Sequence, residues 1–261
     1  MSRPITRKSR QEVERMRRAG RVVAEVLALI EAELRPGVAA ARLDELAERH
    51  MRANGAIPSF KGYLGGGRYG EGPGAYPATI CLSIDDEVVH GIPGDRTIRE
   101  GQIVSVDAGC SIDGWHGDAA RTWIVGEVGD DARRLVDATR AALAAGIAAA
   151  TRGSRIGEIS GAVEDVASAA GFGIVRQFVG HGIGTDMHEA PQIPNYRTAS
   201  LGIRLEPGHT LAIEPMLTLG DASVAVLGDG WTVATTDGSL AAHYEDTIAI
   251  TDDGPEVLTS L

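Results

Sequence analysis

The chain has 261 residues, with 25 lysines and arginines against 36 aspartates and glutamates, a formal net charge of −11. This acidic balance argues against a dedicated binder of nucleic acid or anionic membranes, because such proteins present a basic face. The composition is that of a soluble globular protein, and no segment approaches 18 uninterrupted apolar residues. Cys81 and Cys110 form no C-x-x-C pair, which indicates neither a disulfide framework nor a thiolate zinc site and favours the cytoplasm.

Helices are predicted where apolar residues recur at helical spacing and a glycine or proline ends the pattern. They are expected over 9–34, 39–53, 131–151 and 156–170. Gly37 and Gly55, before and after the second helix, are 18 residues apart, and so are Gly153 and Gly171 around the fourth. This matching spacing predicts an internal duplication.

Strand patterns lie between and after the helix pairs. They are expected over 80–84, 87–90, 103–108, 122–128, 174–179, 210–215, 231–235 and 244–250. Turns are predicted at Asp113-Gly114, Asp229-Gly230 and Asp237-Gly238. The order predicts an α+β fold with helices over one face of a mainly antiparallel sheet. The glycine-rich stretch 65–74 is too irregular for a phosphate-binding loop, and we expect a mobile loop there.

Several common catalytic motifs are absent from the sequence. There is no G-x-S-x-G elbow and no Walker A sequence, and His188-Glu189 lacks the second histidine of H-E-x-x-H. Serine-hydrolase, P-loop and zincin mechanisms are therefore excluded.

Four carboxylates lie within strand-like apolar segments. Asp118 follows Asp107 by 11 residues across the Asp113-Gly114 turn, so a hairpin would bring the two side by side. Glu214 and Glu245 also lie in or at the entry of apolar strands. Each acid alone is also compatible with a turn or an exposed edge. Together they favour a cation site, because buried carboxylates repel one another unless a cation binds them.

Three histidines are candidates for chemistry. His181 is flanked by glycines that leave its imidazole uncrowded, His188 follows seven residues later, and His90 ends the run Val88-Val89-His90. His116 and His243 are expected to be structural.

The sequence resembles the type I methionine aminopeptidases of the bacterial short form over nearly its whole length. The segments that carry the resemblance are Asp86-Glu87-Val88-Val89-His90-Gly91-Ile92-Pro93, Asp113-Gly114-Trp115-His116-Gly117-Asp118, Gly180-His181-Gly182-Ile183-Gly184, Ile213-Glu214-Pro215-Met216 and Tyr244-Glu245-Asp246-Thr247. It implies a single catalytic domain over 1–261 with the α+β pita-bread fold. In that fold two pseudo-twofold halves, roughly 10–128 and 131–251, have helices covering a curved, mainly antiparallel sheet.

The resemblance also implies a dinuclear metal centre. Its ligands would be Asp107, Asp118, His181, Glu214 and Glu245, with Asp118 and Glu245 bridging. This oxygen-rich set suits two divalent ions of Co, Mn, Fe or Zn and does not choose among them. The implied activity is removal of the initiator methionine from nascent polypeptides whose second residue is small, by a water activated between the two ions.

Roles for other residues follow from the same resemblance. Glu214 would also shuttle a proton, His188 would stabilise the oxyanion, and His90 would contact the substrate. The side-chain pocket would be formed by Tyr76, Cys81, Met187 and Trp231. The sequence departs from the family at Met187, which is usually aromatic, at Asp246, which replaces a common histidine, and in the longer loop 64–75.

Two other functions remain open at this point. Xaa-Pro aminopeptidases and prolidases share the fold and metal set, but they generally carry a further N-terminal domain, whereas the first helix here begins near Ser9. A metal-free binding module of this fold would show gaps at the five ligand positions, and there are none. We expect a monomer acting on nascent polypeptide N-termini, without nucleic-acid specificity or membrane attachment, and leave transient ribosome association open.

Overall fold

The computed structural model describes residues 5–64 and 74–261, so the glycine-rich loop predicted at 65–74 lies almost entirely outside the described residues. Within these ranges the elements, in chain order, are α1 (Arg10–Glu33), α2 (Ala40–Ala53), β1 (Ile57–Pro58), β2 (Ile80–Ile84), β3 (Glu87–Val89), β4 (Ile103–Ile112), β5 (Trp115–Ile124), α3 (Asp130–Ala149), α4 (Ile156–Ala170), β6 (Gly173–Ile174), β7 (Gly180–Gly182), β8 (Glu189–Ile193), β9 (Thr210–Ile213), β10 (Met216–Thr218), β11 (Val224–Val226), β12 (Val233–Thr235), β13 (Ala241–His243), β14 (Glu245–Thr251) and β15 (Gly254–Val257).

All four predicted helices are present, with ends within two residues of the expected ones. Helix α1 begins at a capping box, in which Glu12 N–H donates to the Ser9 side chain while the Glu12 carboxylate accepts from Ser9 N–H. Helix α4 ends at Gly171, which has the left-handed φ of +79° that glycine adopts without strain. These local signals explain why the helix boundaries were readable from the sequence.

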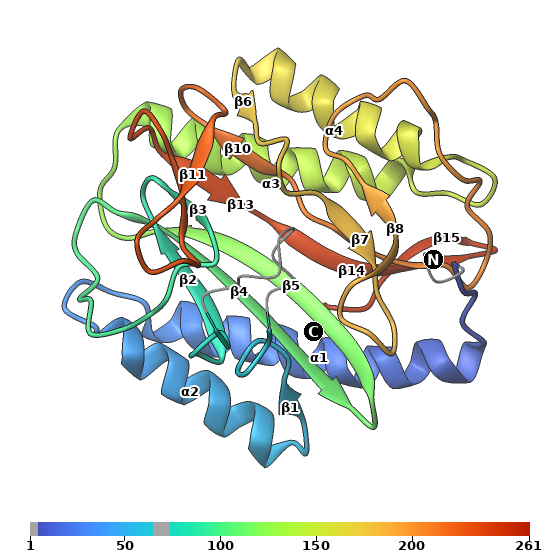
Figure 1. The fold of residues 1–261 in the computed structure, drawn as a ribbon, viewed down its shortest axis with the longest axis horizontal. Coiled ribbons are helices and arrows are strands. Elements are labelled where there is room, and N and C mark those ends of the chain that lie inside the picture. The colour runs from blue at the N-terminus through green and yellow to red at the C-terminus, as the bar shows by residue number, and fades with distance from the viewer. Residues whose placement is uncertain (1–4, 65–73) are drawn as a thin grey trace.

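The strands form one large curved sheet and two small ones, and every pairing between them is antiparallel. Along the large sheet the order is β1-β4-β5-β14-β9-β7-β8, with β2 on β4 and β15 on β14. The small sheets are β13-β10-β6 and β11-β12-β3. Figure 1 shows α1 and α2 along one side of the molecule and α3 and α4 along the other, with the strands between them. The predicted α+β architecture with a mainly antiparallel sheet is confirmed.

The helix-facing side of the sheet forms the core. Val104, Val106 and Ala108 of β4 are buried in one cluster with apolar residues of α1 and α2. A second cluster joins α3 and α4 to β9, β14 and neighbouring strands. Side chains alternate along a strand, so Asp107, between Val106 and Ala108, faces away from the helices. The fold thus directs this carboxylate to the face that the helices leave open.

Several predicted strands differ from the structure in their bounds, such as the one predicted over 103–108, which continues to Ile112, and two differ most. The strand predicted over 122–128 was wrong in its bounds, because β5 runs from Trp115 to Ile124. The first half of β5 is rich in small and polar residues, so it lacks the alternation of apolar and polar residues that predicts a strand. Of the strand predicted over 174–179 only Ile174 is in a strand, and β7 begins at Gly180. The Asp113-Gly114 hairpin is confirmed, with Ile112 pairing with Trp115 and both turn residues at positive φ.

No helix in residues 5–64 or 74–261 is long and apolar enough to cross a membrane.

Candidate metal centre

Antiparallel register brings three of the four acids to one face of the large sheet. Asp107 of β4 pairs with Ala120 of β5, and Asp118 lies two residues before Ala120, so both carboxylates are on the same face as diagonal neighbours. Ala120 pairs on its other side with Glu245 of β14. The short Ala120 side chain therefore lies between three acids.

Glu214 reaches the same face at the junction between two sheets. Asp246 pairs with Ile213 in the large sheet, and Met216 pairs with His243 in the small one, in the same register on both sides of the junction. Continuing this register places Glu214 directly opposite Glu245. We call residues 213–216 and 243–246 the seam, because both chain segments cross there from one sheet to the other.

His181 of β7 approaches the acids from the far side of β9. Its Nε2 lies 3.6 Å from Glu214 Oε1. Its Nδ1 lies 2.9 Å from the carbonyl oxygen of Gly182, and because a carbonyl can only accept, Nδ1 carries the proton. Nε2 is therefore the unprotonated nitrogen, and its lone pair is directed toward the carboxylate cluster. Donor atoms of Asp118, His181 and Glu245 lie within 4.8 Å of one another.

Burial and mutual repulsion shift the titration of the whole cluster. Burial raises the pKa of Asp107 to about 7. The pKa values of Asp118, Glu214 and Glu245 are raised well above their usual range, first by burial and then by the neighbouring carboxylates. Burial lowers the pKa of His181 to about 3, so its imidazole is neutral at physiological pH. This is the electrostatic environment that a bound cation would relieve.

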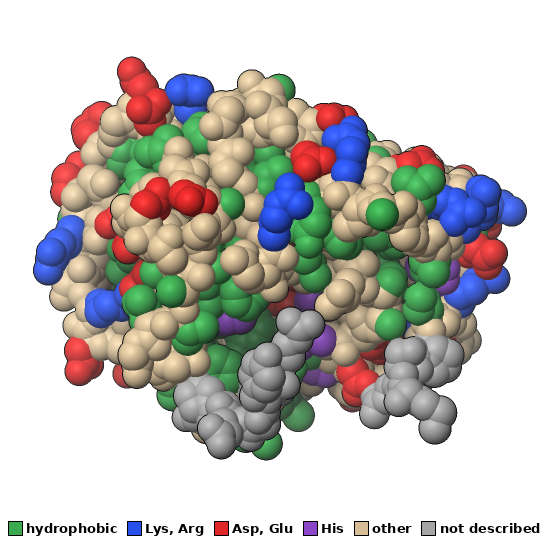
Figure 2. Space-filling view, turned by 45° about the horizontal axis from the view of Figure 1, so that its top comes forward, with side chains coloured by type: hydrophobic (Ala, Val, Ile, Leu, Met, Phe, Trp, Pro, Cys, Tyr) green, Lys and Arg blue, Asp and Glu red, His purple; other side chains and the backbone are tan. Residues whose placement is uncertain are grey.

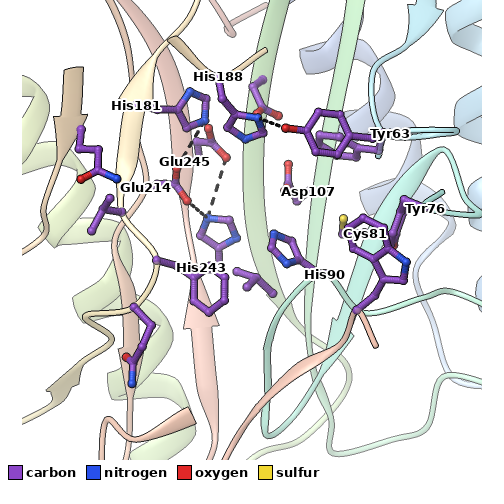
Figure 3. Close-up of a pocket in the computed structure, with 18 residues that line it drawn as sticks. Tyr63, Tyr76, Cys81, His90, Asp107, His181, His188, Glu214, His243 and Glu245 are labelled. Atoms are coloured by element: carbon purple, nitrogen blue, oxygen red, sulfur yellow. Dashed lines mark hydrogen bonds and ion pairs between the residues drawn. The ribbon is translucent and has the colours of Figure 1, made fainter. Parts of the chain in front are cut away.

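The cluster forms the floor of a cavity of about 470 Å³. Figure 2 shows histidine side chains within a hollow on this face, bordered by hydrophobic ones, and Figure 3 shows the labelled side chains converging on it. His90 lines the cavity with a backbone φ of +61°, an unusual value for a residue other than glycine, and burial lowers its pKa to about 4. His188 also lines it, with its ring centroid 4.3 Å from that of His181.

An apolar cluster adjoins the acids and contains all four predicted pocket residues. Tyr76, Cys81 and Met187 are buried in it and Trp231 packs against it from the edge. The Tyr76 and Trp231 rings meet edge to face, with centroids 5.2 Å apart. The Tyr76 hydroxyl donates to the Gly91 carbonyl oxygen at 2.8 Å, which leaves its ring face to the cluster. The structure thus joins an apolar recess to the carboxylates.

Comparison with known proteins matches this arrangement to one family. The description of metallopeptidase family M24 fits residues 14–252, which is most of the chain. The chain belongs to metallopeptidase family M24.

Relatives within the M24 family share nearly the whole length of the chain. A methionine aminopeptidase of Clostridium acetobutylicum is 46% identical over 97% of this chain and 97% of its own. The crystal structure of a methionine aminopeptidase from Thermotoga maritima superposes with a TM-score of 0.93 at 41% identity, covering 99% of this chain and all of that one. A prolidase from Pyrococcus furiosus matches at a TM-score of 0.75 and 21% identity over 66% of its chain, which shows the shared fold alone.

The donor atoms fit the divalent metal that the M24 family implies. Asp107 Oδ1, Asp118 Oδ1 and Glu245 Oε1 are buried without a hydrogen-bond partner in the described part of the chain. Buried polar atoms normally have hydrogen-bond partners. Three unpartnered carboxylate oxygens in one cluster therefore indicate that a bound group is their partner. Carboxylate oxygens and a neutral imidazole are ligands for divalent transition metals. The protein is a metal-binding M24 member.

Sequence reasoning missed several residues that line this cavity, among them two aromatic residues and one histidine. Phe60 and Tyr63 line the cavity from the segment after β1, and their proximity depends on tertiary folding that no local pattern reveals. His243 was expected to be structural, yet it lines the same cavity beside Glu214 and Glu245. The sequence does contain a signal for His243, because this residue precedes Glu245 by two positions at a strand and therefore shares its face.

Proposed function

We propose that this protein is a methionine aminopeptidase, which removes the N-terminal methionine from polypeptides whose second residue is small. The observation that supports this best is the full-length identity of 46% to a methionine aminopeptidase, in a chain whose five expected ligand residues converge on one cavity. No observation favours the proline-directed alternative, because the prolidase likeness is one of fold.

The proposed ligands are Asp107, Asp118, His181, Glu214 and Glu245, which would hold two divalent cations, and Asp118 and Glu245 would be the bridging ligands. Co, Mn, Fe and Zn are all compatible with this donor set. When bound, such a pair of cations lowers the pKa of water and polarises the scissile carbonyl.

The chain's own side chains supply proton transfer and orientation. Glu214 lies at the seam with a carboxyl group that faces the cavity, where it takes a proton from the attacking water and passes it to the leaving amine. His188 donates a hydrogen bond to the developing oxyanion, and His90 contacts the substrate near the scissile bond or its free amine. Burial keeps His90 neutral, so it does not repel the substrate's ammonium group.

Specificity for methionine comes from the recess beside the carboxylates. Tyr76, Cys81, Met187 and Trp231, with Phe60, present soft and apolar surfaces to an unbranched thioether. The predicted departure at Met187 places a flexible side chain where the family usually has a ring, so the recess adapts to its occupant.

The wider assignments belong to the same proposal. Residues 1–261 would form one catalytic domain with halves of roughly 10–128 and 131–251, supported by the positive φ shared by Gly37, Gly55, Gly153 and Gly171. The enzyme would work as a cytoplasmic monomer on nascent polypeptide N-termini.

The test is hydrolysis of Met-Ala-Ser and of an Ala-Pro peptide by metal-stripped protein supplied with Mn, Fe, Co or Zn. We expect release of methionine from the first peptide and no cleavage of the second. Asp118→Asn should remain folded by circular dichroism and lose activity. Failure to cleave the methionine peptide with every metal would refute the proposal, and preferential cleavage before proline would replace it with the prolidase alternative.

A further inference from the structure

His243 is the last residue of β13 and lies at the seam. It pairs with Met216 and precedes Glu245 by two residues, so it projects to the face that carries Glu245 and, across the strands, Glu214. Only 2% of its surface is exposed. A histidine buried this deeply needs a partner for each ring nitrogen that water cannot reach.

The Nε2 atom of His243 has no hydrogen-bond partner within the described ranges. It lies 3.9 Å from Glu214 Oε2 and 3.9 Å from Glu245 Oε2. Both distances exceed the roughly 3.2 Å limit of a good hydrogen bond. They match the separation of two ligands on one ion, because atoms that each lie about 2.1 Å from a metal are roughly 3–4 Å apart.

The surroundings of Glu214 also match ligands arranged around one ion. Its Oε1 faces His181 Nε2 at 3.6 Å while its Oε2 faces His243. Figure 3 shows the two glutamates between the two imidazoles. Donor atoms of Glu214, His243 and Glu245 form a second group within 4.8 Å of one another, beside the group that contains His181.

We propose that His243 is a sixth ligand of the metal centre and binds through Nε2 on the side of the two glutamates that is remote from His181. This inference rests on the metal centre of the proposed function and adds a residue to it. The centre then has two imidazole donors. Because imidazole suits Zn and Fe while carboxylates suit Mn, the second imidazole of His243 biases the site toward Zn and Fe.

Direct ligation can be measured without turnover. Metal-free protein labelled with nitrogen-15 histidine is loaded with cadmium-113, and the one-bond couplings between cadmium and nitrogen are counted. We expect two of the seven histidines to show such coupling, with the signal of one lost in His243→Gln and of the other in His181→Gln. A hydrogen bond from His243 to a glutamate would give no such coupling, so a single coupled histidine in the unmodified protein overturns the inference even if a variant fails to fold.

Metal affinity provides the second measurement. Titration of metal-free protein should show Zn binding at least about tenfold weaker in His243→Gln, with Mn binding changed by less than about threefold. His50→Gln is the matched control, because His50 pairs with Glu25 at 2.9 Å between α1 and α2 and lines none of the cavities beside the acids. Equal losses for Zn and Mn would contradict the proposed ligation. Lack of peptidase activity with both couplings present would refute the proposed function and leave His243 as a ligand.

Discussion

The Tyr63 hydroxyl lies 2.9 Å from Nδ1 of His188, with the two rings edge to face and their centroids 5.4 Å apart. A neutral imidazole has one donor and one acceptor nitrogen. When Tyr63 donates to Nδ1, the proton of His188 is on Nε2, which is the nitrogen able to donate to a substrate carbonyl. Tyr63 is therefore a positioning residue for the proposed role of His188.

Replacing Tyr63 by phenylalanine keeps the ring contact and removes the hydroxyl. We expect kcat to fall about fivefold to tenfold with little change in KM, since one hydrogen bond contributes about 1 kcal/mol. The same substitution in a His188→Ala background should have no further effect on kcat. Independent, multiplicative losses in the double variant would show that Tyr63 does not act through His188.

Gly109 pairs with Asp118, and a methyl group there would enter the recess. Its Cβ would lie 2.9 Å from Met187 Cε and 3.0 Å from both Asp118 Oδ1 and Phe60 Cε1. Such overpacking costs about 1–3 kcal/mol, so, if this strain falls on the substrate-binding recess, Gly109→Ala should lower kcat/KM for a methionine peptide about fivefold or more. Gly129→Ala, where the methyl meets no atom within 4 Å, is the control and should retain activity. Equal activity of the two variants would contradict the packing argument.

Lys8 and Glu189 form an ion pair of 2.5 Å in which both side chains are largely buried. Glu189 also accepts from the Thr185 backbone N–H at 2.9 Å, so the pair anchors the segment that carries Met187 and His188. Lys8→Met leaves the carboxylate without its cation and should lower the free energy of unfolding by about 1.5–3 kcal/mol, together with kcat.

The exposed neighbouring pair Arg7–Glu206 provides the control for Lys8. Both of its side chains are at least half exposed, so Arg7→Met should change the free energy of unfolding by less than about 1 kcal/mol. Urea denaturation of both variants checks the comparison. If Lys8→Met is no more destabilising than Arg7→Met, the buried pair does not anchor the segment.

The metal-free protein should lose stability as the pH rises from about 6.5 to 8. Burial raises the pKa of Asp107 to about 7 in the folded state and raises the pKa values of the other three acids well above their usual range, while all four are ionised in the unfolded chain. The native state therefore holds more protons, and its free energy of unfolding falls by about 1.4 kcal/mol per pH unit for each proton retained. Neutral His181 and His243 oppose this trend only below about pH 6.5, where unfolded histidine binds protons.

Thermal unfolding at the two pH values measures this slope. Added Zn or Mn should abolish the loss, because a cation stabilises the ionised carboxylates. Asp107→Asn in the metal-free state should show a shallower slope than the unmodified protein. A metal-free protein that is equally stable at both pH values would contradict the raised pKa values.

Local signals in the sequence were enough for the helices and for the first pair of acids. Gly171 marks a helix end, and the Asp113-Gly114 turn sets a two-residue hairpin whose register puts Asp107 and Asp118 on one face. The start of β5 was missed because its small and polar residues lack apolar alternation. Gly117 there has the backbone of Gly20 in α1 so close that a Cβ would lie 2.6 Å from Gly20 N, a contact that an isolated strand pattern does not contain.

The remainder of the site depended on contacts between distant segments. The resemblance supplied Glu214 and Glu245 as ligands, while their direct opposition follows from pairing between strands about 30 residues apart in the chain. Tyr63 reaches His188 across 125 residues. Neither relation has a local signature, which is why Tyr63 and Phe60 were absent from the predicted set.

The seam joins the large sheet to a small one. Glu245 belongs to the large sheet and His243 to a small one, and Tyr244 N–H bonds to Pro215 O between them at 3.3 Å. A cation bound by side chains on both strands would hold the two sheets together where two segments of the chain cross between them. A shift of either segment by one residue would turn the donor side chains to the helix side of the sheet, so a bound cation would favour the native strand register.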